Sequence, residues 1–108
     1  MNENDLEQDI QAKGLTAPRV TPTHIDAVID DVQYHVFEVA CLTVCCMTLR
    51  NGFTVTGESA CASPKNFNES IGRRVAYDNA RNKIWALEGY LLKQRLHDAP
   101  ATEVTFNA

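Results

Sequence analysis

The dipeptide Asn51-Gly52 is the feature that most constrains what this chain can fold into. It separates two runs rich in valine, threonine, cysteine and aromatic residues, at positions 34–50 and 53–59. Asn-Gly between two such runs is the strongest short-range signal for a β-hairpin. The sequence therefore predicts an antiparallel hairpin in the middle of the chain, with Asn51 and Gly52 as its two loop residues.

A two-residue loop determines which side chains share a face of the hairpin. It pairs Thr48 with Val55, and side chains along a strand alternate between the two faces. One face then carries Leu42, Val44, Cys46, Phe53 and Val55, and we expect it to be the core. The other face is mixed, with Cys41, Thr43, Cys45, Met47, Leu49, Thr54, Thr56 and Glu58. Because exposed apolar patches usually mark interfaces, this mixed face predicts a homodimer or a higher homo-oligomer.

Amphipathic helices are predicted on both sides of the hairpin. In residues 21–32, Thr21 is a natural N-cap, Pro22 suits the first helical position, and apolar residues recur at helical spacing. A longer helix begins after Asn66 or Asn68 and runs to about residue 96. Its buried stripe is expected to be Ala76, Ala80, Ile84, Leu87 and Leu91. The predicted class is α+β, in the order α-β-β-α, with the hairpin packed against a short N-terminal and a long C-terminal helix.

The length and the charge distribution predict a single domain with an acidic arm. The 108 residues suit one domain, which we place at 20–97, between a flexible acidic arm at 1–19 and a tail at 98–108. Residues 1–38 hold eight acidic and two basic residues, a net charge of −6, whereas residues 65–95 have a net charge of +4. The overall charge of −4 argues against a non-specific nucleic-acid coat.

The N-terminal sequence and the hydropathy predict a soluble protein of the cytoplasm. The N-terminus is acidic and polar, whereas a signal peptide needs a basic start and an apolar run. No apolar stretch approaches the roughly 20 residues that span a bilayer. In that compartment the four cysteines are expected to be reduced thiols.

A stripe of arginine and aromatic residues is the candidate ligand site. Arg73, Tyr77, Arg81 and Trp85 are spaced by four and so lie on one side of the long helix. Arginine binds phosphate with a planar pair of donors, and aromatic rings stack on bases. Near the helix N-terminus, where free amides favour anions, the preceding loop adds further candidates. The full predicted ligand-binding set is Asn66, Phe67, Arg73, Arg74, Tyr77, Arg81 and Trp85.

A structural interpretation of the same stripe stays open. Tyr77 and Trp85 could pack against the first helix or a partner subunit, while the arginines form ordinary surface pairs with Asp78. The cysteines are a poor zinc site, because Cys45 and Cys46 point to opposite faces of a strand. We find no phosphate loop, no catalytic motif and no paired acid and base, so we expect neither an enzyme nor a bound cofactor or metal.

Residues 20–96 resemble a family of small tailed-phage proteins typified by an uncharacterised Sf6 gene product. The resemblance is carried by the hairpin LTVCCMTLRNGFTVTGESACASPKNF and the helix opening IGRRVAYDNARNKIWALEGYLL. The α-β-β-α order and the basic, aromatic second helix are also similar to the Thoeris anti-defence proteins of phages. That similarity implies a sponge that binds cyclic ADP-ribose-type or cyclic oligonucleotide signals without cleaving them.

Two functions are therefore carried forward from the sequence. The first is a phage anti-defence protein that sequesters a small anionic nucleotide in the host cell cytoplasm. The alternative is a phage interaction protein that inhibits a host protein and uses its acidic N-terminal arm. Deleting residues 1–17 distinguishes them, because only the second function needs the arm.

Overall fold

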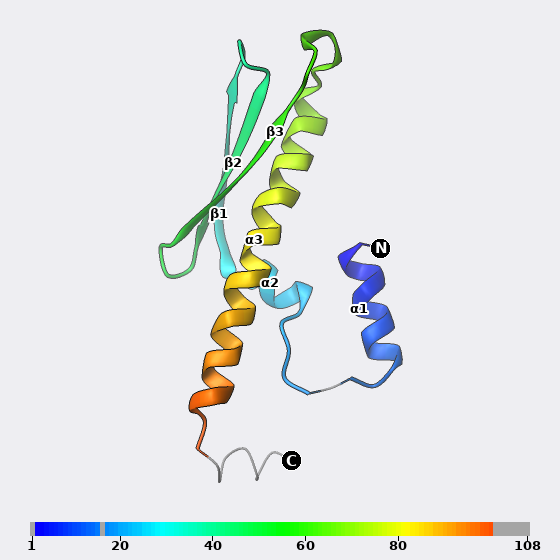
Figure 1. The fold of residues 1–108 in the computed structure, drawn as a ribbon, viewed down its shortest axis with the longest axis vertical. Coiled ribbons are helices and arrows are strands. Elements are labelled where there is room, and N and C mark those ends of the chain that lie inside the picture. Colours follow the sequence, from blue (N-terminus) through cyan, green and yellow to red (C-terminus); the bar gives the residue numbers. More distant parts are fainter. Residues whose placement is uncertain (1, 16, 101–108) are drawn as a thin grey trace.

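The computed structural model describes residues 2–15 and 17–100, in which helices precede and follow a three-stranded antiparallel sheet along the chain. The elements in chain order are α1 (Glu3–Ala12), α2 (Pro22–Val28), β1 (Ile29–Phe37), β2 (Leu42–Leu49), β3 (Thr54–Ala60), the 3₁₀ turn η1 (Pro64–Asn66) and α3 (Glu69–Asp98). In Figure 1 the sheet lies on one side of α3 and α1 on the other. The α+β class is confirmed, with one strand and one helix more than the sequence indicated.

The first predicted helix ends four residues early and continues as a strand. Thr21 caps α2 as expected, and its hydroxyl oxygen accepts a hydrogen bond from the amide of His24 at 3.1 Å. The backbone becomes extended at Ile29, and β1 pairs with β2 from Ile29 to Phe37, with a register shift between Ile29 and Asp31. Sheet pairing therefore overrides the helical spacing of Ile29 and Val32, two β-branched residues that also suit a strand.

The run at 34–50 is two strands rather than one. A turn at positions 38–41 separates β1 from β2, and the amide of Cys41 donates a hydrogen bond to the carbonyl of Glu38 at 3.2 Å. Cys41 has a positive φ of 50°, which is uncommon outside glycine and asparagine. Because no glycine, proline or asparagine marks this turn, the sequence pattern did not reveal it.

The hairpin loop contains three residues, which shifts the predicted register by one. The amide of Leu49 donates to the carbonyl of Phe53 at 2.8 Å, so the loop is 50–52. Gly52 has φ +89°, as a three-residue loop requires at its last position. The Asn51 side chain accepts a hydrogen bond from the amide of Phe53 at 2.9 Å. Met47 consequently faces Val55, where a two-residue loop would place Thr48.

The predicted core face of the hairpin is wrong as a result. The buried side chains facing the helix are Thr43, Cys45, Met47, Leu49 and Val55. Of the predicted core set only Val55 is buried; Leu42, Val44 and Cys46 are half-buried on the other face, and Phe53 is exposed. A one-residue change of register moves a whole set of side chains to the opposite face.

Helix α3 packs closely on the sheet through small residues, as predicted. Its N-cap is Asn68, and its buried stripe includes Gly72, Ala76, Ala80 and Ile84. The backbone of α3 lies directly over Gly57 of β3, so that a Cβ at Gly57 would collide with backbone atoms of Ala76 and Ala80. Towards the end of the helix the stripe leaves the core: Leu87 is half-buried beside it, and Leu91 is 41% exposed.

The segment expected to be a flexible arm contains helix α1. Asn2 caps this helix through a hydrogen bond from the amide of Asp5 at 2.8 Å. None of the residues of α1 is buried. Polar side chains therefore contribute to its attachment to the rest of the chain, and one of them, Glu3, belongs to the candidate site. Residues 101–108 of the predicted tail lie outside the described residues.

Candidate functional site

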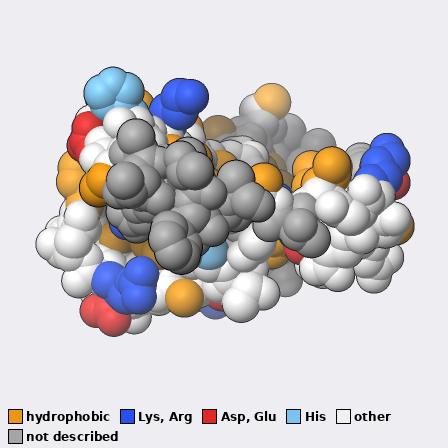
Figure 2. Space-filling view, turned by 90° about the horizontal axis from the view of Figure 1, so that it is seen from below, with side chains coloured by type: hydrophobic (Ala, Val, Ile, Leu, Met, Phe, Trp, Pro, Cys, Tyr) orange, Lys and Arg blue, Asp and Glu red, His pale blue; other side chains and the backbone are white. Residues whose placement is uncertain are grey.

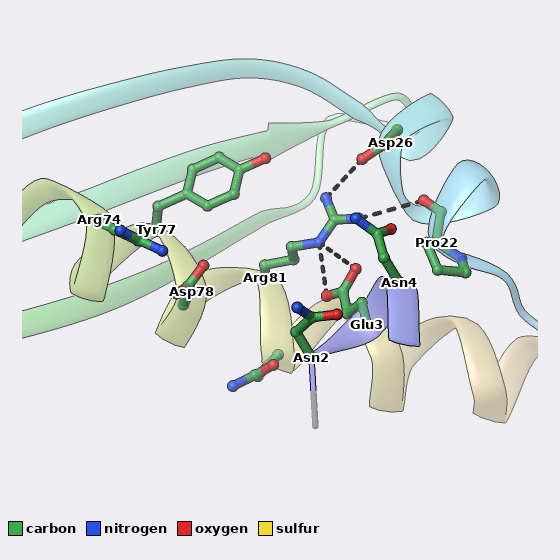
Figure 3. Close-up of a pocket in the computed structure, with 10 residues that line it drawn as sticks. Asn2, Glu3, Asn4, Pro22, Asp26, Arg74, Tyr77, Asp78 and Arg81 are labelled. Atoms are coloured by element: carbon green, nitrogen blue, oxygen red, sulfur yellow. Dashed lines mark hydrogen bonds and ion pairs between the residues drawn. The ribbon is translucent and has the colours of Figure 1, made fainter. Parts of the chain in front are cut away.

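Arg81 is the centre of a polar cluster that joins α1, α2 and α3. Its side chain leaves α3 and is only 8% exposed. Its Nε donates to both carboxylate oxygens of Glu3, at 2.8 and 3.0 Å, and its Nη1 lies 2.8 Å from a carboxylate oxygen of Asp26. Its Nη2 donates to the carbonyl of Pro22 at 3.3 Å (Figure 3). Every nitrogen of the guanidinium group is therefore hydrogen-bonded.

Trp85 binds the same carboxylate, one turn further along α3. Its indole Nε1 donates to Oε2 of Glu3 at 3.0 Å. Two donors that come from one face of α3 thus converge on a single carboxylate oxygen. We refer to Arg81 and Trp85 together as the anion clamp. The four-residue spacing recognised in the sequence produces it, because residues four apart are neighbours on a helix surface.

The electrostatics of the cluster follow from these contacts. Hydrogen bonds from Arg81 are the main reason that the pKa of Glu3 lies below its usual 4.5, and Trp85 lowers it further. The Glu3 hydrogen bond likewise raises the pKa of Arg81 above its usual value. Glu7, one turn further along α1, accepts hydrogen bonds from both Nη atoms of Arg19, which lower the pKa of Glu7 to about 2. The first two turns of α1 are thus held by carboxylates that are charged at neutral pH.

An open cleft of about 580 Å³ lies beside the clamp. Figure 3 shows Tyr77 and Arg74 following each other along α3, one and two turns before Arg81. The cleft combines two guanidinium groups, three carboxylates, three side-chain amides and one phenol ring. The lining residues are Asn2, Glu3, Asn4, Pro22, Asp26, Arg74, Tyr77, Asp78, Arg81 and Asn82.

The structure brings together only part of the predicted ligand-binding set. Arg74, Tyr77 and Arg81 line the cleft, and Trp85 lines an adjoining apolar hollow next to Glu3. Tyr77 and Trp85 also pack against the hydrophobic core, whereas the structural interpretation of the stripe had placed them against the first helix or a partner subunit.

The remaining three predicted residues lie elsewhere. Arg73 is exposed, forms an ion pair with Glu69 at 2.7 Å, and lies over the ring of Tyr34 at 5.5 Å. Asn66 and Phe67 precede α3, and a rise of about 1.5 Å per residue puts them roughly 20 Å from Arg81. Neither Asn66 nor Phe67 lines the cleft.

The acidic partners of Arg81 were not identified from the sequence. We considered Asp78 as its surface partner, whereas Glu3 and Asp26 bind it. The opposite charges of residues 1–38 and 65–95 were the available signal, because they indicate that the two segments attract each other.

Figure 2 looks onto the end of the molecule where α3 finishes, and there basic, acidic and hydrophobic side chains are interspersed among the described atoms.

The cysteines and the buried carboxylate of Glu88 lie outside this cluster. Cys41 and Cys45 are buried and Cys46 and Cys61 half-buried, all as free thiols. Burial raises the pKa of the Cys45 thiol. Within residues 2–15 and 17–100, no group of three or more His, Cys, Asp or Glu side chains is arranged to hold a metal ion. Glu88 is a further buried carboxylate, and its Oε1 lies 2.6 Å from Nε2 of His24.

The chain was found to match a known protein family. The profile of the phage protein (N4 Gp49/phage Sf6 gene 66) family matches residues 20–96. The chain belongs to this phage protein family. The matched range contains β1–β3, nearly all of α3 and both residues of the anion clamp, whereas α1 and Glu3 lie outside it. No curated protein matches the chain. No solved structure matches it either.

Among the residues that the structure describes, no helix has both the length and the apolar character needed to cross a bilayer.

Proposed function

We propose that this phage protein is an anti-defence protein that binds a small anionic nucleotide in the cleft beside α3 and sequesters it without cleaving it. The ligand class is a cyclic ADP-ribose-like or cyclic oligonucleotide signal, met in the cytoplasm of the host cell. The observation that carries the proposal is the anion clamp. Arg81 and Trp85 converge on one oxygen of Glu3, at 2.8 and 3.0 Å.

The Glu3 carboxylate marks where an anionic group of the ligand would bind. Carboxylate and phosphate oxygens accept the same donors, and arginine binds either in a planar geometry. Arg81 is held in place by Pro22 and Asp26 through its other two nitrogens. The guanidinium group is therefore oriented before a ligand arrives, which lowers the entropic cost of binding.

The size and the lining of the cleft favour a compact ligand over a polymer. Its volume of about 580 Å³ falls within the range of about 300–1,000 Å³ typical of small-molecule pockets. Arg74 adds a second positive charge, Tyr77 a ring face and Asn82 a side-chain amide. Charge, stacking surface and amide hydrogen bonds are the groups that nucleotides need from a protein.

Binding of an anion at the clamp requires that Glu3 leaves Arg81. Two carboxylates already surround the guanidinium group, and a ligand phosphate beside both of them would be repelled. Because α1 buries none of its residues, moving its first turn exposes little apolar surface. Glu3 is thus a displaceable occupant of the site, whereas Asp26 remains as the partner that orients Arg81.

Isothermal titration calorimetry with cyclic ADP-ribose and with cyclic dinucleotides tests the proposal. We expect binding by the wild type, a loss of about tenfold or more for Arg74→Ala, and a larger loss for Arg81→Lys, since lysine lacks the planar pair of donors. Arg73→Ala is the matched control, because Arg73 lies on the same helix outside the cleft. Mass spectrometry of the bound ligand should recover it intact. Equal losses for Arg73→Ala and Arg74→Ala would contradict the assignment.

The alternative function, inhibition of a host protein through the acidic arm, is favoured by the surface of α1. This helix presents Asp5, Asp9 and Leu6 to the solvent, and Leu6 is 50% exposed. Deleting residues 1–17 separates the two functions. A nucleotide sponge should keep its ligand or bind it more tightly, whereas an inhibitor that uses α1 should lose its effect on the host.

A further inference from the structure

The sheet has a second face that no described element covers. Helix α3 packs on the face that carries Cys45 and Met47, and β2 is the central strand between β1 and β3. Side chains at paired positions point to the same face of a sheet. The strand pairing therefore assigns to the other face Asp31, Gln33, His35, Phe37, Leu42, Val44, Cys46, Thr48, Thr54, Thr56, Glu58 and Ala60. None of these side chains is buried.

One end of this open face is apolar. Phe37, Leu42 and Ala60 form a row across the three strands, and Val44 lies next to Leu42 along β2. Phe37 is 49% exposed, and its ring is contacted edge-on by His35, with 4.4 Å between the ring centroids. Contiguous apolar side chains on a sheet face usually pack against another surface.

We propose that a second copy of this chain covers the open face, in a face-to-face dimer whose two-fold axis runs along β2. A rotation about that axis leaves β2 over β2 and exchanges the two outer strands. Each row of side chains then meets the same row of the second copy, with its order reversed. The interface is isologous, as in most protein dimers.

Charge complementarity is the observation that selects a second copy. His35, Val44 and Glu58 form one row, with the base on β1 and the acid on β3. In the dimer His35 lies over Glu58 of the second copy, and Glu58 lies over His35 of the second copy. Val44 meets its own counterpart on the axis. One row thus contributes two base–acid contacts around an apolar centre.

Side-chain volume supports the same axis. In the apolar row, the large Phe37 on β1 lies over the small Ala60 of the second copy, and Leu42 meets its counterpart. An axis perpendicular to the strands would instead place this apolar row over Asp31, Thr48 and Thr54, at the other end of the sheet. Burying a carboxylate against apolar side chains is costly, so the axis along β2 is favoured.

This dimer replaces the interface expected from the sequence and does not depend on ligand binding. The β2 side chains of the mixed face that we expected to form subunit contacts are covered by α3. Its β3 side chains, Thr54, Thr56 and Glu58, lie on the open face. The proposed ligand cleft is lined by α1, α2 and α3, so the open face can associate whether or not a nucleotide is bound.

Analytical ultracentrifugation of the full chain tests the dimer. A three-stranded face is a small interface, so we expect dissociation in the range of about 1–100 µM. Val44→Lys should weaken the dimer by about tenfold or more, because it places two like charges on the axis. Val75→Lys, at an exposed position of α3, is the matched control and should leave the dimer intact. A chain that stays monomeric at several hundred micromolar would overturn the proposal.

A charge swap tests the predicted row. His35→Glu should weaken association, because it opposes two acids, and the double variant His35→Glu/Glu58→Lys should restore it. Within one chain the two residues lie on opposite sides of β2. Restored association of the double variant therefore reports a contact between residue 35 of one copy and residue 58 of the other. Failure of the double variant to restore the dimer would contradict the alignment of this row.

Crosslinking distinguishes this face from other occupants. Cys46 lies near the axis, so in a Cys61→Ser background a short bis-maleimide should join two chains through Cys46. Adding Cys46→Ser should abolish the product. A chain truncated after residue 100 should crosslink equally well. Loss of the crosslink in the truncated chain would overturn the proposal, because residues 101–108 would then be what makes the contact.

Discussion

The carboxylate of Glu3 lies 2.8 Å from Nε of Arg81, although 78 positions separate the two residues in the sequence. This contact joins a helix outside the matched family range to a helix inside it. Because Trp85 donates to the same oxygen, the contact helps to hold α1 in place and also occupies the proposed anion-binding position. Its consequences for stability and for pH dependence are measurable.

Arg81→Ala should destabilise the fold much more than Arg73→Ala. Removing Arg81 leaves the carboxylates of Glu3 and Asp26 without their partner beside a nearly buried position, which we expect to cost about 1–3 kcal/mol. Arg73 is an exposed residue of the same helix, and its pair with Glu69 should contribute less than about 0.5 kcal/mol. Urea unfolding of both variants provides the comparison. Similar losses in the two variants would show that the Arg81 network adds no stability.

Acidification should release α1 from the rest of the chain, because it protonates the carboxylates of Glu3 and Glu7. The pKa values of Glu3 and Glu7 are depressed in the folded chain, to about 2 for Glu7. Their contribution to stability is therefore complete above the unfolded pKa of about 4.5 and is lost as the pH falls through the folded values. The single tryptophan, Trp85, reports this change, and its fluorescence should shift to the red between about pH 4.5 and pH 2.

The variant Glu3→Gln is the control for this titration. Its side chain carries no titrating group, so the part of the fluorescence change that comes from Glu3 should disappear. The remaining change should follow Glu7 and general acid unfolding. Superimposable titration curves for the wild type and Glu3→Gln would contradict the role of Glu3 as the partner of Trp85.

Gly57→Ala should be among the most damaging small substitutions in the sheet. A Cβ at this position collides with the backbone of α3 at Ala76 and Ala80. Backbone atoms cannot relieve such a collision by changing rotamer, as a side chain could. We expect a loss of about 3 kcal/mol or more, at the upper end of the cost of overpacking. Gly89→Ala is the matched control, because a Cβ there meets nothing within 4 Å. It should stabilise the helix by about 0.5–1 kcal/mol, and thermal unfolding measures both effects.

The accessibility of the cysteines tests which face of the hairpin is buried. Cys46 and Cys61 are half-buried, whereas Cys45 is fully buried and its thiol has a raised pKa. A maleimide under native conditions should therefore label Cys46 and Cys61 long before Cys45, since the thiolate is the reactive form. Peptide mapping by mass spectrometry gives the order. Faster labelling of Cys45 than of Cys46 would favour the register of a two-residue loop.

The local signals in the sequence predicted α2, α3 and the hairpin, but not α1, β1 or the register of the hairpin. Asn51-Gly52 correctly indicated a turn, and the caps at Thr21 and Asn68 begin the two predicted helices. The dipeptide does not determine the loop length, because Gly52 suits the last position of a three-residue loop as well as a two-residue one. Both faces of β2 are partly apolar, so hydrophobicity alone could not correct the error.

The candidate site was predictable on its α3 side only. Helical spacing aligned Arg81 with Trp85 correctly, since that spacing is a local property of the chain. Glu3 and Asp26 come from distant segments, and no local pattern specifies which basic residue they bind. The opposite charges of the two segments indicated attraction without giving the pairs.

The most direct test of the central claim follows the indole N–H signal of Trp85 by NMR while cyclic ADP-ribose or a cyclic dinucleotide is added. If the anion clamp is the ligand site, the signal should move as the ligand replaces Glu3. Glu3→Gln should then bind more tightly than the wild type, by about tenfold, because the competing charge-assisted contact is weaker. A Trp85 signal that stays unchanged at saturating nucleotide in both proteins would contradict the claim.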